Sequence, residues 1–257
     1  IQQGCNHRCT YCIVWKARGP ERSVPVESVL EQVREAQEAG VPEVVLTGVN
    51  LGAYDGKSAT DEHVEIDELL EAIMERTTIA HVRISSVEPM DISERLLKVM
   101  ARYPQRIAPF LHLPVQSGND HILKMMNRNY TREKYLSQVA TARSYMPDLV
   151  ITTDIIVGFP NETEEEFEDT ISLCEEVRFD AMFTFIYSKR VGTPAASMPD
   201  PYTRADKQKH FDRLMDVSNR ISGEKHKEYE GKTVRVLVDG ETGREEYNLS
   251  SRTNGGR

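Results

Sequence analysis

The sequence predicts an α/β protein: a partial (β/α)6 barrel followed by the start of a small β-barrel domain. Three observations carry this prediction. Helical and strand-like segments alternate strictly between about residues 26 and 187, which is typical of a parallel sheet with right-handed crossovers. Five strand-like segments follow a cysteine-rich N-terminal loop, which favours six strands in all. After residue 230 the pattern changes to an alternation of period two. An open doubly wound sheet is the alternative, because periodicity alone does not determine closure.

The elements follow one another in a regular order. Apolar residues at helical spacing over residues 26–39 predict a helix that stops at Gly40, and a β-branched run over 43–48 predicts a buried strand. The same pairing of helix and strand repeats over residues 66–76 with 81–86, 92–103 with 110–113, 132–145 with 149–157, and 164–177 with 181–187. In such a barrel the functional loops lie at the carboxyl ends of the strands.

The C-terminal part differs in character. A long polar helix is predicted over residues 204–229, and residues 233–238 alternate as a strand does. We therefore expect a barrel domain over residues 1–230 and a small β domain, present only in part, over residues 231–257, with Gly231 at the boundary.

Composition is that of a folded, water-soluble protein. Of 257 residues, 39% are hydrophobic and 28% charged, and mean hydropathy is -0.50. No long apolar run and no signal peptide is present, so we expect a cytoplasmic protein without membrane association.

The net charge is -9. The acidic run 162–169 reads as the solvated first turns of a helix. Nucleic-acid binding stays open because basic residues gather locally, at Lys16, Arg18 and Arg22 and at Arg252 and Arg257.

Three cysteines near the N-terminus carry the strongest chemical signal. Cys5, Cys9 and Cys12 have the spacing C-x3-C-x2-C, and Gly4 before them permits a tight turn. Most zinc and iron–sulfur sites use four protein ligands, so three thiolates suggest a cubane cluster with one iron open to another ligand. A zinc site that includes His7 is the alternative, although this ring lies between the first two cysteines. Cys174 falls on a predicted helix, where we expect it to be buried as a small hydrophobic residue.

The cysteine spacing resembles that of the radical S-adenosylmethionine superfamily. The resemblance implies a [4Fe–4S] cluster on Cys5, Cys9 and Cys12, with S-adenosylmethionine chelating the open iron. It also implies reductive cleavage of the sulfonium to a 5′-deoxyadenosyl radical, in a barrel that shelters the reaction from water.

A narrower resemblance, to the methylthiotransferases, covers nearly the whole chain. It rests on LTGVN (46–50), LHLPVQSG (111–118), DIIVGFPNET (154–163) and YSKRVGTPAA (187–196). Residues 250–254 are similar to part of the RNA-binding TRAM domain of that family. The segment 112–118 differs from the DIPLQH type of the ribosomal-protein branch, which favours the tRNA branch. Residues 177–180, 183–187 and 252–254 resemble the MiaB type, whereas residues 47–50 and 83–89 resemble the MtaB type.

The resemblance implies a reaction and its partners. It predicts transfer of a 2-methylthio group to N6-isopentenyladenosine next to the anticodon of tRNA, or alternatively to N6-threonylcarbamoyladenosine. The implied partners are the tRNA anticodon stem-loop, an external electron donor and a sulfur source. Family members hold a second [4Fe–4S] cluster in a preceding domain that this sequence does not include, so we expect this chain to cleave S-adenosylmethionine without inserting sulfur. A different class of function, an RNA-binding module with a structural metal, is the remaining alternative.

Five residues are candidates for cofactor contacts because each lies at or near the carboxyl end of a predicted strand. They are Gly48, Ser86, Gln116, Asp154 and Gly158. The structural alternatives are a simple turn at Gly48 and at Gly158, and at Gln116 an N-cap region in which Ser117 and Asn119 open the next helix. Asp154 interrupts an apolar strand, and a buried carboxylate needs a partner, which the cofactor could supply. Ser85, Tyr187 and Arg190 lie on the same predicted rim. Trp15 is expected to pack under the cysteine loop, with adenosine stacking as the alternative. No catalytic residue is assigned.

Overall fold

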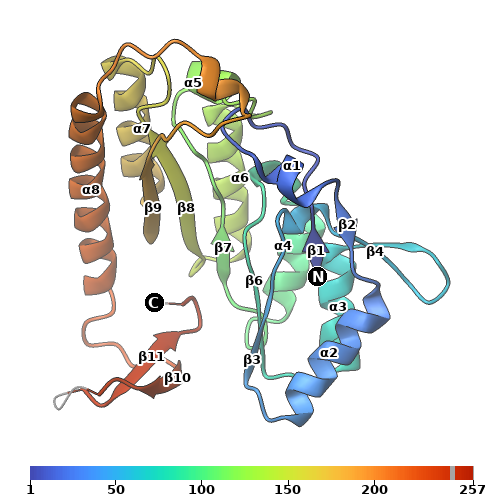
Figure 1. Cartoon of the computed structure of the whole chain (residues 1–257). Coiled ribbons are helices and arrows are strands. Elements are labelled where there is room, and N and C mark those ends of the chain that lie inside the picture. The colour runs from blue at the N-terminus through green and yellow to red at the C-terminus, as the bar shows by residue number, and fades with distance from the viewer. Residues whose placement is uncertain (244–246, 257) are drawn as a thin grey trace.

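The five strands predicted after the cysteine loop form the centre of the fold. The structure is a computed structural model that describes residues 1–243 and 247–256 (Figure 1). The strands are β3 (Glu43–Leu46), β6 (His81–Ile84), β7 (Phe110–His112), β8 (Val150–Val157) and β9 (Ala181–Ile186). Parallel ladders join β3 to β6 and β7 through β8 to β9. Isolated parallel bridges, Val82 with Ile107 and Ser86 with His112, connect β6 to the β7 segment.

The order of the strands in space identifies the architecture. Each strand neighbours the one before it in the chain, as in a barrel, whereas a doubly wound sheet reverses its order at a switch point. The partial barrel is therefore confirmed. The first strand differs from the expectation of a sixth parallel member. β1 (Gln2–Gln3) pairs antiparallel with β2 (Arg22–Ser23), and the Ile1 amino group before it donates to Thr47 O, directly after β3, at 2.9 Å. β1 is two residues long because Gly4 turns the chain directly after it.

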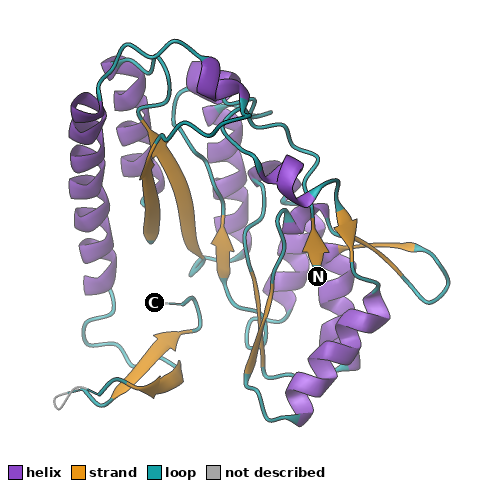
Figure 2. Cartoon of the chain, in the orientation of Figure 1, coloured by secondary structure: helices purple, strands orange, loops and turns teal. Residues whose placement is uncertain are grey.

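The outer helices cover one face of these strands, as the secondary-structure colouring makes visible (Figure 2). They are α2 (Val26–Glu38), α3 (Ile66–Arg76), α4 (Glu94–Arg102), α6 (Arg132–Tyr145) and α7 (Glu164–Val177). α4 begins two residues later than predicted because the Ser93 hydroxyl caps it by accepting from Leu96 N at 3.1 Å.

Alternation along each strand separates a buried face from an open one. The side chains of Leu46, Ile84, Leu111, Ile155 and Val157 pack in the core beneath the helices. The residues between them face the other side, where Val45, Phe183 and Phe185 are 47%, 53% and 52% exposed. The concave face of the partial barrel is therefore open and partly apolar.

Several short elements were not predicted from the sequence. They are α1 (Val14–Arg18), the hairpin of β4 (Asp55–Lys57) and β5 (His63–Glu65), and the 3-10 turns η1 (Leu51–Ala53), η2 (Pro89–Asp91) and η3 (Pro194–Ser197). α5 (Asp120–Met125) begins after Asn119, which was expected to open a helix and caps it by accepting from His121 N and Ile122 N. α1, η1, η2, α5 and η3 fall in the loops that follow the cysteines or the strands, so they shape the functional rim.

The C-terminal part consists of α8 (Arg204–Lys227) and a hairpin of β10 (Val236–Glu241) and β11 (Leu249–Thr253). The predicted strand over residues 233–238 thus starts three residues later. Arg252 lies in this hairpin. It was expected to be available for nucleic acid, but it pairs with Glu43 at 2.6 Å and with Asp239. Arg257 lies outside the described residues.

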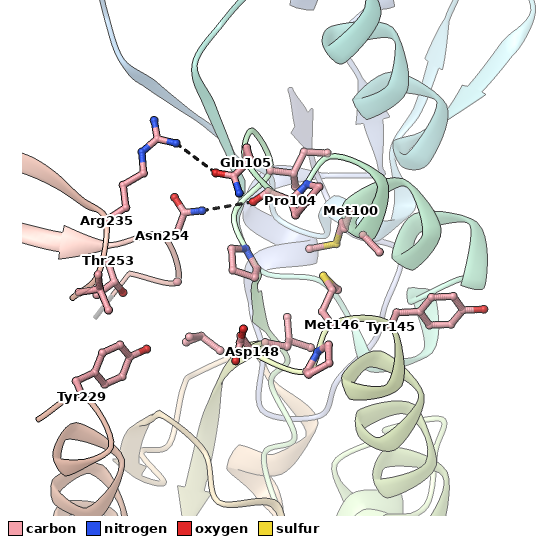
Figure 3. A pocket seen from close by; sticks show the side chains of 18 of the residues that line it. Met100, Pro104, Gln105, Tyr145, Met146, Asp148, Tyr229, Arg235, Thr253 and Asn254 are labelled. Atoms are coloured by element: carbon pink, nitrogen blue, oxygen red, sulfur yellow. Dashed lines mark hydrogen bonds between the residues drawn. The ribbon is translucent and has the colours of Figure 1, made fainter. Parts of the chain in front are cut away.

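A cavity of about 630 Å³ separates this hairpin from the barrel (Figure 3). Arg235 and Asn254 reach across it to Gln105 and to the carbonyl of Pro104. Since Pro109 and Leu149 directly precede β7 and β8, the cavity lies at the amino ends of the strands, opposite the predicted functional rim. Among the helices of the described residues, none has the length and apolarity that a membrane span requires.

Candidate functional site

The cysteine loop begins with a turn that requires glycine. Gly4 has φ +76, and a Cβ at this position would lie 1.9 Å from Pro20 O. Cys5 N then donates to Gly19 O at 3.1 Å, and the Asn6 amide donates to Glu21 Oε2 at 2.8 Å. The loop is thereby fixed against the segment that follows α1.

Thr10 anchors the loop to two distant segments. Its N–H donates to Met126 O at 3.0 Å and its hydroxyl to Met125 O at 2.8 Å, at the end of α5. Its carbonyl accepts from Ala195 N in η3 at 2.9 Å. Because α5 follows β7 and η3 follows β9, the cysteines lie at the carboxyl ends of the strands, where the sequence predicts the site.

The three thiols have different surroundings. Cys9 is buried, whereas Cys5 and Cys12 are half-buried, and burial raises the pKa of Cys5 to about 11. N–H donors point at two of the sulfurs: Val14 N lies 3.4 Å from Cys12 Sγ, and Arg128 Nη1 lies 3.6 Å from Cys9 Sγ. Such donors suit sulfurs that carry negative charge, as thiolates bound to iron do.

These donors fit an iron–sulfur cluster better than a single ion. Within residues 1–243 and 247–256 no three His, Cys, Asp or Glu side chains converge closely enough to hold one metal ion. His7, the alternative zinc ligand, is half-buried and belongs to no such group of side chains among the described residues. A cubane distributes its thiolate ligands over several irons and so accepts cysteines that are farther apart.

A buried ion pair lies directly behind Cys9, and the sequence analysis missed it. Arg128 is 8% exposed and forms a two-pronged pair with Glu88, with N–O distances of 2.9 and 2.5 Å. Arg128 also donates to Pro114 O at 3.0 Å and to the Tyr130 hydroxyl at 3.0 Å. Glu88 follows β6 at the carboxyl end, which was an available signal. Nothing in the sequence associates Arg128 with it.

Gly48 belongs to a turn that is held from β1. Gln2 is 2% exposed, and its Oε1 accepts from Val49 N and Asn50 N, both at 2.9 Å. A Cβ on Gly48 would lie 3.0 Å from Oε1 and Cβ of Gln2. Close packing therefore explains this glycine without a cofactor, and Gln2 is a second residue that the sequence analysis missed.

Ser86 and Gln116 lie on the same rim. Ser86 accepts from Leu51 N through its carbonyl at 3.4 Å and bridges to His112. Gln116 is 7% exposed with φ +70, an uncommon conformation for a residue with a side chain, and its N–H donates to Asp154 O at 2.9 Å. The structure thus places the Gly48 turn, Ser86, Gln116 and Asp154 in one continuous arc.

Asp154 faces the open concave side of the barrel. Its register partner on β9 is Phe183, which is exposed on that face. The carboxylate lies 3.4 Å from His112 Nε2, and His112 Nδ1 contacts the Thr152 hydroxyl at 2.8 Å. The partner of Asp154 in the structure is therefore a histidine. The Asp154 side chain is still 31% exposed, so it is accessible to a ligand.

Gly158 turns the chain at the end of β8. It has φ +66, and a Cβ there would lie 2.6 Å from the Lys207 side chain of α8. Its N–H donates to Glu162 Oε2 at 2.5 Å. Glu162 is 1% exposed, so the first residue of the acidic run is buried and not solvated as expected. Glu164, Glu165 and Glu166 do form the first turn of α7, where Thr163 caps the helix.

The remaining predicted residues have structural surroundings. Tyr187 packs edge-on against Phe159, with ring centroids 5.3 Å apart, and Arg190 accepts from the Thr193 hydroxyl through its carbonyl. Two cationic side chains lie over the Trp15 ring: Arg8 Cζ is 4.4 Å and Lys16 Nζ is 4.9 Å from the ring centroid. Cys174 is fully buried in the core, as expected.

The partial barrel and the three-cysteine loop at the carboxyl ends of its strands define the class of protein to which this chain belongs. The model of the radical SAM superfamily matches residues 1–174, and the chain belongs to that superfamily. The chain is 47% identical over 253 residues to the tRNA-2-methylthio-N(6)-dimethylallyladenosine synthase of Thermoanaerobacter sp. (strain X514), with 98% of this chain and 53% of that protein aligned. It is 46% identical over 242 residues to the protein of the same name from Geobacillus kaustophilus, with 94% and 45% aligned. The chain therefore spans about half the length of these relatives.

Solved structures show the same fold at low identity. The radical S-adenosylmethionine methyltransferase TsrM of Kitasatospora setae superposes with a TM-score of 0.62 at 15% identity, over 76% of this chain and 37% of that one. Coproporphyrinogen III oxidase (HemN) of Escherichia coli gives 0.54 at 18% identity, over 76% and 45%. These likenesses support the fold alone.

Proposed function

We propose that this chain is the radical-generating part of a tRNA methylthiotransferase of the MiaB type. The substrate would be N6-isopentenyladenosine, also called dimethylallyladenosine, next to the anticodon. One observation carries the proposal: the C-x3-C-x2-C loop lies at the carboxyl ends of the barrel strands, in a chain 46–47% identical to synthases of that name.

Cys5, Cys9 and Cys12 would hold a [4Fe–4S] cluster. When bound, such a cluster supplies one electron to the sulfonium of S-adenosylmethionine and so generates a 5′-deoxyadenosyl radical. The chain's own residues fix the cysteines through Gly4 and Thr10. We infer that the arc from Gly48 through Ser86, Gln116 and Asp154 to Gly158 orients the nucleoside and methionine parts of the cofactor.

The substrate adenosine would bind on the open concave face of the barrel. Its exposed Phe183 and Phe185 on β9 offer apolar surface, and Asp154 on β8, the register partner of Phe183, offers one carboxylate. Apolar walls favour burial of an isopentenyl group. An external electron donor, a sulfur source and the tRNA anticodon stem-loop would be the partners, in the cytoplasm. Residues 231–257 would begin a TRAM-like RNA-binding domain that follows the barrel over residues 1–230, and a second [4Fe–4S] cluster would belong to the sulfur-inserting part of the relatives.

Two measurements test this proposal. After anaerobic reconstitution, the chain should contain iron and sulfide and should form 5′-deoxyadenosine from S-adenosylmethionine under reducing conditions. Zinc as the sole stoichiometric metal would favour the RNA-binding module instead. Mass spectrometry of tRNA nucleosides from cells that lack the gene should show loss of 2-methylthio-N6-isopentenyladenosine. Loss of the threonylcarbamoyl derivative alone would assign the MtaB-type substrate.

A further inference from the structure

We propose that Arg128 and Glu88 set the reduction potential of the cluster held by Cys9, with opposite effects. This inference rests on the proposed function, because it requires the cluster on the three cysteines. It assigns to the two residues positioning and tuning roles, not a catalytic role.

The geometry of Arg128 leaves it little freedom. Its five N–H groups have five partners: Nε donates to the Tyr130 hydroxyl, Nη1 to Glu88 Oε1 and Cys9 Sγ, and Nη2 to Glu88 Oε2 and Pro114 O. The Tyr130 hydroxyl is itself held by Pro114 O and Val115 O, both at 3.1 Å. A planar guanidinium with every donor engaged cannot rotate away from the sulfur without breaking several bonds.

Burial makes the charge effective. The Arg128 side chain is 4% exposed, so water screens its charge little, and its Nη1 lies 3.6 Å from Cys9 Sγ on the cysteine loop. The Glu88 side chain is 21% exposed, and its Oε1 accepts from the same Nη1 that lies 3.6 Å from Cys9 Sγ. The cluster would therefore experience the positive charge of Arg128 through the Cys9 sulfur and, behind it, the compensating negative charge of Glu88.

Reduction of the cluster adds one electron, taken from a one-electron reductant, and lowers its total charge by one. No bond to a protein atom forms or breaks in this step. A positive charge and an N–H donor at a ligand sulfur stabilise the more negative state and so raise the potential, and a carboxylate lowers it. Removing Arg128 should therefore lower the potential, whereas neutralising Glu88 should raise it.

A merely structural role predicts a different result. Arg128 also connects the cysteine loop to the turn at Pro114, so its loss could loosen the loop. Loosening would change the potential in the same direction for either partner, or would lower cluster content without a defined shift. The sign of the two shifts separates the explanations.

The test is a redox titration, followed by electron paramagnetic resonance, of the chain reconstituted with iron and sulfide. Arg128→Met should lower the ratio of reduced to oxidised cluster at a fixed solution potential about tenfold, which corresponds to about 59 mV for a one-electron couple. Glu88→Gln should shift the ratio the opposite way. Arg128→Lys keeps the positive charge but loses the two-pronged guanidinium, so its reduction potential should lie between those of wild type and Arg128→Met. If Arg128→Met fails to fold, the double variant Arg128→Met/Glu88→Gln, which buries no unpaired carboxylate, should still show a lowered potential because the N–H donor is lost.

The matched control is Arg76→Met. Arg76 makes a similar two-pronged pair with Glu27, at 2.7 and 2.6 Å, on the exposed surface between α2 and α3, so its loss should leave the potential unchanged. Equal potentials in wild type, Arg128→Met and Glu88→Gln would overturn the inference and leave the proposed function intact. So would shifts of the same sign. A wild-type chain that assembles no [4Fe–4S] cluster would overturn both.

Discussion

The backbone N–H of Gly158 donates a 2.5 Å hydrogen bond to the carboxyl group of Glu162, which is 1% exposed. Burial is the largest influence on this carboxyl and raises its pKa to about 8. The Gly158 N–H and Lys207 act against this rise, whereas Glu166 adds to it. His210 Nδ1 lies 4.0 Å away. The turn at the end of β8 therefore depends on a carboxyl that is largely protonated at neutral pH.

Glu162→Gln should make the folded chain less sensitive to pH. Below about pH 4.5 both states of the wild type hold the proton, whereas between pH 4.5 and 8 the unfolded state releases it and the folded state keeps it. Wild-type stability therefore falls as pH rises through this window. The variant should lose this slope, so its stability relative to wild type should rise by on the order of 3 kcal/mol between pH 5 and pH 8. Urea unfolding, followed by circular dichroism at several pH values, measures the free energy of unfolding of each variant. The control is Glu165→Gln, because Glu165 is exposed. Parallel curves for wild type and Glu162→Gln would contradict the assignment.

Cys9→Ala should leave the barrel folded and abolish cleavage of S-adenosylmethionine, because two remaining thiolates cannot hold the cluster with an open iron. Circular dichroism and a 5′-deoxyadenosine assay measure the two effects separately. Cys174→Ala is the matched control: this thiol is fully buried in the core on α7, so its loss should lower stability by about 1 kcal/mol and spare the cluster. Cleavage retained in Cys9→Ala would mean that the ligand set is wrong.

Gly4→Ala should reduce iron content after reconstitution. The new Cβ would overlap Pro20 O, and φ at this position is +76, which costs an alanine about 1–2 kcal/mol even in open space. Gly19→Ala isolates the second effect, since Gly19 has φ +74 but no atom within 4 Å of an added Cβ. We expect Gly19→Ala to keep most of its iron. Equal losses in both variants would show that backbone strain, and not the contact with Pro20, limits assembly.

Arg252→Gln should weaken the docking of the β10–β11 hairpin more than the binding of RNA. Arg252 pairs with Glu43, which is 4% exposed and keeps His81 and Arg83 as partners, so the loss should cost about 1–2 kcal/mol. Filter binding of tRNA at two salt concentrations should give the wild-type slope, because this guanidinium is already engaged. Deuterium exchange of the hairpin amides should increase. A reduced salt slope would show that Arg252 contacts phosphate.

The sequence predicted the barrel well because its signals are local. Helical periodicity over α3, α6 and α7 and β-branched runs over β3 and β8 each report burial of one face, and the strict alternation implies parallel neighbours. Short elements escaped because they depend on distant partners. α1 contains five residues, and its Lys16 donates to Gly192 O at 2.6 Å, 176 residues away along the chain.

The cysteines of the site were recognisable for the same reason, since their spacing lies within eight residues. Arg128 was not, because its partners Cys9 and Glu88 are 119 and 40 residues away along the chain. Gly158 was predicted to permit close approach of a cofactor. Its positive φ and the contact of an added Cβ with Lys207 also explain on structural grounds why glycine occupies this position. Residues with an extended network of partners require the fold before they can be assigned.

The two anchors of Thr10 also impose an order in time on a nascent chain. Thr10 leaves the ribosome before its hydrogen-bond partners Met125, Met126 and Ala195, which are synthesised more than a hundred residues later. Until then the loop has only its local bonds to residues 19–21, and its three thiols are open to oxidation or to stray metal ions. Insertion of a cluster into a native loop must therefore follow translation of β9 and η3, so the interval between synthesis of the cysteines and completion of the last barrel strand is when this protein needs protection from oxygen.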